Sequence, residues 1–151
     1  MNANILIRQF DAGNDTPSVT ALWRAVLGYG APHNEPAFVI EKKLEVHDGL
    51  FFVAECDGAV VGTVMAGYDG HRGWIYSLAV KSDVRGKGIG LRLVRHAEAA
   101  LARAGCVKVN LQVVETNKGV VEFYRKAGYA VEPRISMGKL LKNERGQARS
   151  Y

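Results

Sequence analysis

Hydrophobic residues recur along this chain at two spacings, one typical of helices and one typical of strands. Near the N-terminus the helical spacing dominates, and it predicts an amphipathic helix that ends near Gly28. The apolar stripe of this helix consists of Val19, Leu22, Trp23 and Val26. Thr16 followed by Pro17 favours a helix start at this point, because a capping hydroxyl and a proline at the first helical position suit an N-terminus.

The segments on either side of this helix have weaker patterns. Residues 4–10 are typical of a first strand, and residues 38–46 are compatible with a short second helix. Between the two helices, residues 29–36 contain two prolines and a glycine, which exclude regular helix and central strand. A mobile loop is therefore expected there.

The middle of the chain has the pattern of an antiparallel meander. Two apolar, β-branched runs at 50–56 and 60–68 are separated by the turn Asp57-Gly58-Ala59, whose Asp-Gly pair tolerates positive φ. A second turn at 69–73 leads into the apolar run 75–80, which suits a buried strand. We therefore expect three consecutive antiparallel strands.

Two more helices and two more strands are predicted in the second half. One helix ends at Gly105, and the other begins at a cap formed by Thr116 or Asn117 and ends at Gly128. Their apolar stripes are Val94, Ala97, Leu101 and Ala104 in the first helix, and Val120, Phe123, Tyr124 and Ala127 in the second. Residues 107–113 alternate between apolar and polar, as in a strand buried mainly on one face.

The end of the chain is less regular. Ile135, Met137 and Leu141 suggest a last strand, and residues 142–151 form a polar tail that is expected to fray. The order of all these elements predicts an α/β (α+β) fold with a mixed, mostly antiparallel central sheet covered by helices on both faces. Because no repeat or linker interrupts the chain, residues 1–141 are expected to form a single domain.

Composition narrows the class of protein. Of the 151 residues, 48% are hydrophobic without a long apolar run, so we expect a globular protein that does not enter a membrane. Residues 1–10 lack the apolar core of a secretory signal, and a cytoplasmic location is therefore expected. Cys56 and Cys106 lack CxxC spacing, so they are expected to be free thiols, and with four scattered histidines they predict no metal site.

The net charge of +5 does not by itself indicate nucleic acid. The basic residues are distributed along the chain, except near the C-terminus, and no aromatic platform interleaved with lysines is present. A solvated surface explains most of this charge, and a phosphorylated ligand would explain some of it. We therefore expect no nucleic-acid partner.

The chemistry is concentrated in a glycine-rich stretch, Arg85-Gly86-Lys87-Gly88-Ile89-Gly90, that joins the strand at 75–80 to the next helix. Glycines let backbone N–H groups approach a ligand, the first helical turn leaves N–H groups without partners, and two side chains add positive charge. This combination suits a pyrophosphate. Two other phosphate loops do not match, because no Ser or Thr follows Lys87 and the third glycine of a dinucleotide fingerprint would fall at Leu91. The alternative is a glycine-rich turn that only caps the helix.

The pattern Arg-x-x-Gly-x-Gly in this stretch resembles the acyl-coenzyme A loop of the GNAT N-acetyltransferase superfamily. A second segment, from Asn117 to Tyr129, is similar to the family's Asn-x(6)-Tyr-x-x-x-Gly-[Phe or Tyr] signature and follows at the expected separation. Two motifs in order are far more specific than either motif alone. The resemblance covers residues 4–141 and implies an acetyl-CoA-dependent acyltransferase.

The resemblance also assigns residues to cofactor binding. Backbone groups of Leu78 and Val80 would contact the pantetheine arm, where two neighbouring parallel strands splay apart. The pyrophosphate would be held by Arg85, Gly86, Lys87, Gly88, Ile89 and Gly90. Asn117 would hydrogen-bond the pantetheine, and Tyr124 would lie near the sulfur as general acid. The alternatives for these last two residues are a helix cap and a core aromatic side chain, respectively.

The implied reaction is direct attack of an amine on the acetyl thioester, with backbone N–H groups near Val80 polarising the carbonyl. Several family members place a glutamate base on the strand after the loop helix. Gln112 occupies that position here, and an amide cannot accept a proton from an ammonium group. The remaining candidates for the base are Glu115, Glu35, His71 and Tyr76.

The acceptor is specified only in outline. The resemblance assigns its selection to the first two helices and to nearby loops, whose candidate contacts are Tyr29, His33, Glu35, Asp69, Trp74 and Tyr76. Because no base is evident, we favour an acceptor that loses its proton easily. An α-amino group of an amino acid, peptide or protein N-terminus has a pKa of about 8, whereas an alkylamine has a pKa of about 10.4, so the α-amino group is favoured. The alternative function is a non-catalytic acyl-CoA-binding regulatory module, and a homodimer is one possible assembly.

Overall fold

The computed structural model describes residues 4–28, 31–142 and 144–146. They divide into two compact units at the boundary between Gln112 and Val113. Over the described residues, the first unit holds a five-stranded sheet with three α-helices, and the second holds one α-helix.

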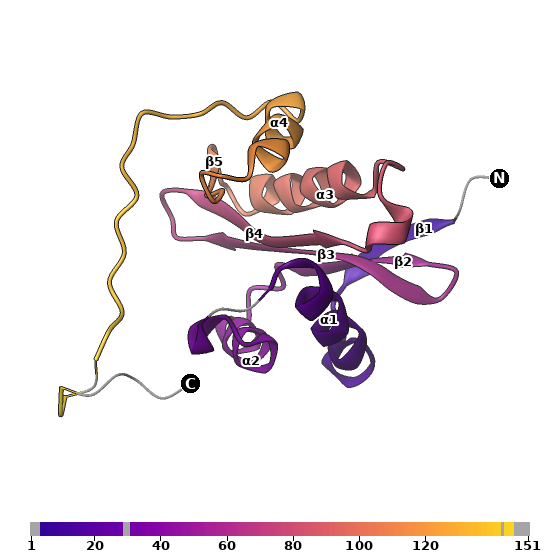
Figure 1. The fold of residues 1–151 in the computed structure, drawn as a ribbon, viewed down its shortest axis with the longest axis horizontal. Coiled ribbons are helices and arrows are strands. Elements are labelled where there is room, and N and C mark those ends of the chain that lie inside the picture. The colour runs from indigo at the N-terminus through magenta and orange to yellow at the C-terminus, as the bar shows by residue number, and fades with distance from the viewer. Residues whose placement is uncertain (1–3, 29–30, 143, 147–151) are drawn as a thin grey trace. The chain divides into compact units, whose positions relative to one another are not determined.

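The strands of the first unit lie side by side in sequence order (Figure 1). They are β1 Ile5–Gln9, β2 Phe51–Cys56, β3 Ala59–Tyr68, β4 Gly73–Val80 and β5 Val109–Leu111. The first four pair antiparallel, whereas β5 is parallel to β4. Asp57 and Gly58 both have positive φ, as the tight turn between β2 and β3 requires. The predicted mixed, mostly antiparallel sheet and its hairpin are confirmed.

Helices cover both faces of this sheet, as the sequence predicts. α1 Ala12–Val26 and α2 Pro36–Val46 lie on one face, and α3 Ile89–Arg103 lies on the other (Figure 1). The core on the first face includes the buried residues Phe10, Val19, Leu22, Trp23, Ile40, Phe51, Val53 and Met65. Under α3 the buried residues include Leu93, Val94, Ala97 and Leu101. The helical stripes read from the sequence are therefore the buried faces.

The start of α1 differs from the sequence expectation. The helix begins at Ala12, with Asp11 as its N-cap, and not at Thr16-Pro17. The Asp11 carboxylate accepts a hydrogen bond from the backbone N–H of Gly13 at 3.0 Å, which satisfies a donor of the first turn. Pro17 lies inside the helix, where it forfeits one backbone hydrogen bond.

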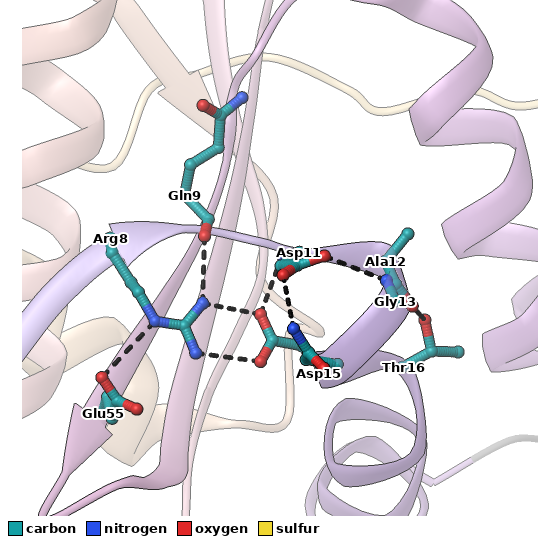
Figure 2. Close-up of polar contacts among 9 residues, drawn as sticks. Arg8, Gln9, Asp11, Ala12, Gly13, Asp15, Thr16 and Glu55 are labelled. Atoms are coloured by element: carbon teal, nitrogen blue, oxygen red, sulfur yellow. Dashed lines mark hydrogen bonds and ion pairs between the residues drawn. The ribbon is translucent and has the colours of Figure 1, made fainter.

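An ion-pair network explains why the earlier start is stable (Figure 2). Arg8 on β1 donates to both carboxylate oxygens of Asp15 at 2.7 and 2.9 Å, and Asp15 also accepts from the backbone N–H of Asp11 at 2.8 Å. Asp15 is buried, and its hydrogen bond from Arg8 holds the pKa of its carboxyl below the usual value. The first turn of α1 is thereby tied to the edge strand, which the periodicity of the sequence could not indicate.

Other boundaries of the first unit differ by a few residues. α2 starts at Pro36, two residues before the expected position, and the preceding residues Pro32–Asn34 form a short 3-10 helix. The first two residues of the expected loop, 29 and 30, lie outside the described residues. β5 covers only Val109–Leu111 of the predicted strand 107–113. This short pairing has consequences for the candidate site.

The second unit contains α4 Lys118–Lys126, with Asn117 as its N-cap as predicted. The last strand expected around residues 135–141 is wrong, because the described residues after α4 contain no such strand. Ile135 and Met137 are 91% and 90% exposed, so their side chains have no packing surface to hold them. An alternating apolar pattern forms a strand only where a neighbouring strand and a buried face are available.

Candidate active site

The central feature of the first unit is the edge of β4. Its pairing with β5 ends at Ile75, which lies opposite Leu111, while β4 itself continues to Val80. From residue 76 onward, that edge of β4 has no partner in the register of β5. The pairing of the two parallel strands therefore ends before Leu78 and Val80, the residues for which the resemblance implies contact with a pantetheine arm.

A β-bulge interrupts β4 within this open stretch. In the register with β3, Tyr76 lies opposite Met65 and Ala79 opposite Thr63, so Ser77 and Leu78 together face a single residue of β3. Ser77 has a φ of +52°, which is uncommon for a residue with a side chain. Such a conformation persists only where the surroundings hold it, and it is found more often at functional positions than elsewhere.

The glycine-rich stretch is separated from β4 by a short 3-10 helix, Ser82–Val84, and leads into α3. Gly86 and Gly88 have φ values of +80° and +79°, and a Cβ added at either would meet nothing within 4 Å. Gly88 is the N-cap of α3 and provides no side-chain acceptor, so it leaves the N–H groups of the first turn without a cap from its own side chain. Open space in front of such a helix start is what an anionic group needs.

Two cations flank this helix start. Arg85 and Lys87 are both exposed, and the Arg85 Nε donates to the backbone oxygen of Val80 at 3.1 Å. This bond ties the guanidinium to the C-terminal end of β4 and leaves its terminal nitrogens for a ligand. Backbone donors, a helix start and two positive charges thus occur together, as the sequence predicts.

A cavity of about 590 Å³ opens beside the other end of β4. Its lining comes from α2, β3 and β4, from the connections that follow α2 and β3, and from the residue after β5. It consists of Lys43, Val46, Asp48, Gly67, Tyr68, Asp69, Trp74, Ile75, Tyr76 and Gln112. Three of the residues predicted as candidate acceptor contacts therefore lie around one cavity: Asp69, Trp74 and Tyr76. Gln112, at the position of the missing glutamate base, lies there too.

The cavity contains an ion pair between a buried lysine and a partly exposed aspartate, which the sequence analysis missed. Lys43 is 7% exposed, and its ammonium group donates to the Asp48 carboxylate at 2.7 Å and to the backbone oxygen of Ala66. The same ammonium lies 5.6 Å from the centre of the Tyr76 ring. A signal existed, because Pro36, Ile40 and Lys43 share one helical face, and the first two are apolar.

Asp69 shapes the wall of this cavity. One of its carboxylate oxygens accepts from the backbone N–H groups of His71 and Arg72 at 2.7 and 2.6 Å, and the other accepts from Trp74 Nε1 at 3.3 Å. These hydrogen bonds, that from Arg72 above all, hold the pKa of Asp69 below its usual value. Two carboxylates and one ammonium give the lining a net charge of −1, which favours a cationic ligand.

Several nominated residues lie away from this cavity. His33 is in the short 3-10 helix, and Glu35 pairs with Arg24 at 2.8 Å on the surface. His71 is exposed in the turn before β4. None of the three is among the residues that line the cavity, and Tyr29 lies outside the described residues.

The second unit holds the other motif. Asn117 caps α4 through a long hydrogen bond of 3.4 Å from the backbone N–H of Val120 to its side-chain oxygen. Tyr124 is buried and packs edge to face with Phe123 and Tyr129. Burial raises the pKa of Tyr124 to about 12.

Among the described residues, no cluster of three or more His, Cys, Asp or Glu side chains could hold a metal ion. None of the helices in the described ranges is long and apolar enough to cross a bilayer.

A mixed sheet with a splayed parallel pair, a bulged central strand and a glycine-rich helix start defines an acyltransferase fold. The model of the Acetyltransferase (GNAT) family matches residues 17–129, and the chain belongs to that family. It is therefore an acyltransferase, as the two motifs predict.

The relatives and solved structures agree with this assignment. The chain is 46% identical over 110 residues to a Yersinia enterocolitica protein named acetyltransferase, covering 73% of this chain and 78% of that one. A Pectobacterium atrosepticum protein of the same name is 42% identical over 132 residues, covering 87% and 93%. The fold is similar to that of an aminoglycoside N-acetyltransferase solved with CoA, with a TM-score of 0.74, 15% identity and coverage of 92% and 96%.

Proposed function

We propose that this protein is an acetyl-CoA-dependent N-acetyltransferase whose acceptor is a primary amine, with an α-amino group of an amino acid, peptide or protein N-terminus favoured. One observation carries the proposal. A single strand, β4, runs from the aromatic and acidic cavity at Trp74 and Tyr76, through the bulge at Ser77 and Leu78, to the glycine-rich helix start. The proposed acceptor pocket, the backbone proposed to polarise the thioester and the proposed anion site therefore follow one another along the chain, so an amine, an acetyl group and a pyrophosphate could be bound in that order.

The donor side of the site is proposed to be held largely by the backbone. The pyrophosphate of acetyl-CoA fits the helix start at Gly86 and Gly88, where positive φ and open space let N–H groups approach phosphate oxygens. The pantetheine arm fits the edge of β4 beyond the end of its pairing with β5, the stretch that contains Leu78 and Val80. Asn117, which caps α4, is proposed from the second motif to bond the same arm.

The acceptor is proposed to bind in the 590 Å³ cavity. Trp74 and Tyr76 are 37% and 41% exposed, so aromatic surface is accessible, and aromatic faces attract cations. Together with the net charge of −1, this surface favours an amine in its ammonium form at the binding stage.

The amine must then lose a proton before it attacks. Gln112 cannot take that proton, so the base is one of the cavity groups acting directly or through water, or Glu115. Removing a proton at pH 7 costs about 4 kcal/mol for a lysine-like amine and about 1 kcal/mol for an α-amino group. This difference supports the α-amino preference.

The nitrogen forms a bond to the acetyl carbon while the carbon–sulfur bond breaks, and CoA leaves as a thiolate that takes up a proton. Tyr124 is proposed as the donor to this sulfur. With a pKa of about 12, its phenol stays protonated over the working range of pH, which suits a hydrogen-bond donor in the transition state. Full transfer of its proton to sulfur is not required.

The function is tested by following acetyl-CoA consumption over a panel of amines. A dipeptide amide provides an α-amino group alone, and an Nα-acetylated lysine amide provides an ε-amino group alone. We expect faster turnover of the first. Faster turnover of spermidine or of the ε-amine would overturn the preference, and binding of acetyl-CoA without turnover of any amine would overturn the transferase assignment.

A further inference from the structure

A buried chain of hydrogen bonds ends at the bulge of β4. Trp23 Nε1 on α1 donates to Thr63 Oγ1 on β3 at 2.8 Å, and Thr63 Oγ1 donates to the backbone oxygen of Ser77 at 2.9 Å. Trp23 is 1% exposed and Thr63 is fully buried. The Thr63 hydroxyl has a single proton, and the hydrogen bond to the backbone oxygen of Ser77 uses it.

This bond decides where the next N–H group points. In a trans peptide the C=O and the N–H lie on opposite sides, and the described residues contain no cis peptide bond. Because the Ser77 oxygen is held toward Thr63 on β3, the N–H of Leu78 is directed away from β3. That is the edge of β4 where the pairing with β5 has already ended.

We propose that Thr63 is a positioning residue for acyl transfer, which aims the Leu78 N–H at the thioester carbonyl by holding the Ser77 carbonyl. The inference rests on the proposed function. Trp23 keeps the Thr63 hydroxyl oriented, because its own N–H occupies the acceptor side of that oxygen. Regular antiparallel pairing would not produce this arrangement, since Ser77 has positive φ and neither Ser77 nor Leu78 has a partner in the β3 register.

The test replaces Thr63 by Val, which keeps the shape of the side chain and removes the hydroxyl. We expect kcat to fall about 10-fold or more, because a backbone donor to the developing oxyanion is no longer aimed. The KM for acetyl-CoA should rise less than kcat falls, by about threefold, because one hydrogen bond is lost while most of its binding surface is elsewhere. Thr63→Ser retains the hydroxyl and should restore kcat.

A matched control separates positioning from stability. Val19→Ala removes buried packing from α1 in the same core without removing a hydrogen bond, so it should lower Tm while kcat per folded molecule is unchanged. The inference is overturned if Thr63→Val loses no more kcat than Val19→Ala, or if Thr63→Ser fails to restore it.

A binding measurement tests the role of Thr63 separately from turnover. Failure to turn over any amine would contradict the proposed function, whereas the affinities for acetyl-CoA and CoA test Thr63 itself. Acetyl-CoA has the carbonyl that Leu78 is proposed to bond, and CoA lacks it. In calorimetric titrations, Thr63→Val should weaken acetyl-CoA relative to CoA by about threefold or more, the scale of one lost hydrogen bond. An unchanged affinity ratio overturns the role of Thr63.

Discussion

The proposed anion site and the proposed acceptor cavity lie at opposite ends of β4 and are built in different ways. The anion site is a contiguous stretch, residues 85–90, whose function depends on backbone N–H groups and on the absence of side chains. The cavity is assembled from α2, β3, β4 and Gln112, and it depends on what particular side chains present to each other. A site made of contiguous backbone groups can be recognised as a sequence motif. A cavity made of side chains from several elements has no such motif, and changes in those side chains can select a different acceptor.

The largest effect is expected in the anion site. Gly88→Glu places a side chain and a negative charge where the phosphates must approach, at a φ of +79° that disfavours any side chain. We predict loss of measurable acetyl-CoA binding in calorimetry with the folded structure retained, since a Cβ there meets no other group. Wild-type affinity in this variant would remove the anion site from the proposal.

Tyr124→Phe should slow the chemical step without changing the binding of acetyl-CoA or of the amine acceptor. The ring packing against Phe123 and Tyr129 is retained, while the hydroxyl is lost. We predict a fall in kcat of about 10² to 10⁴, the usual range for a lost acid or hydrogen-bond donor, with acetyl-CoA affinity kept. The wild-type rate should also show no titration of this phenol below about pH 11, given a pKa of about 12. A variant that loses stability but keeps its kcat would make Tyr124 a packing residue.

A smaller effect should separate the cavity from the anion site. Asp48→Asn keeps the size of the side chain but has one acceptor oxygen in place of two, so it can retain the hydrogen bond from Lys43 or that from the backbone N–H of Leu50 but not both, while the cavity loses one negative charge. We predict that KM for amine acceptors rises about fivefold, corresponding to about 1 kcal/mol for a partly exposed charge, and that this difference shrinks in high salt. The KM for acetyl-CoA should not change.

The control for that variant is Glu45→Gln on α2, which removes the same charge from an exposed residue outside the cavity. It should leave both KM values unchanged. Equal effects of the two variants on acceptor KM would mean that the cavity does not bind the acceptor.

The ion pair between Arg8 and Asp15 at the start of α1 should affect the stability of the fold but neither the proposed anion site nor the cavity. Asp15→Asn removes the charge partner of Arg8 and is expected to destabilise the fold by roughly 2 kcal/mol at pH 7, the scale of hydrogen bonds to charged groups. Because the pKa of Asp15 is lowered in the folded state, its contribution is present above the unfolded pKa of about 4 and is lost as pH falls through the folded value. Thermal melts should therefore show the difference between wild type and variant shrinking in acid. A difference that persists at low pH would contradict this account.

Much of the fold could be predicted from the sequence because its signals are local. Helical stripes, the Asp57-Gly58 turn and Gly88 at the head of α3 each depend on residues that are neighbours in the chain. The proposal of an anion site at residues 85–90 rests on the same kind of local signal. Errors arose where a contact between two elements decides the outcome. Arg8 on β1 anchors α1 four residues ahead of Thr16, and residues 135–141 lack the neighbouring strand that would make them a strand.

The sequence by itself determined the family, the order of elements and the glycine-rich helix start, because motif spacing and periodicity are properties of adjacent residues. Only the tertiary structure decided which side chains surround the cavity. It excluded Glu35 from that lining, added Lys43 and Asp48, and placed the Thr63 hydroxyl against the Ser77 carbonyl. These relations depend on the register between strands and on how α2 and the residues after it pack against the sheet, which motif spacing and periodicity do not specify.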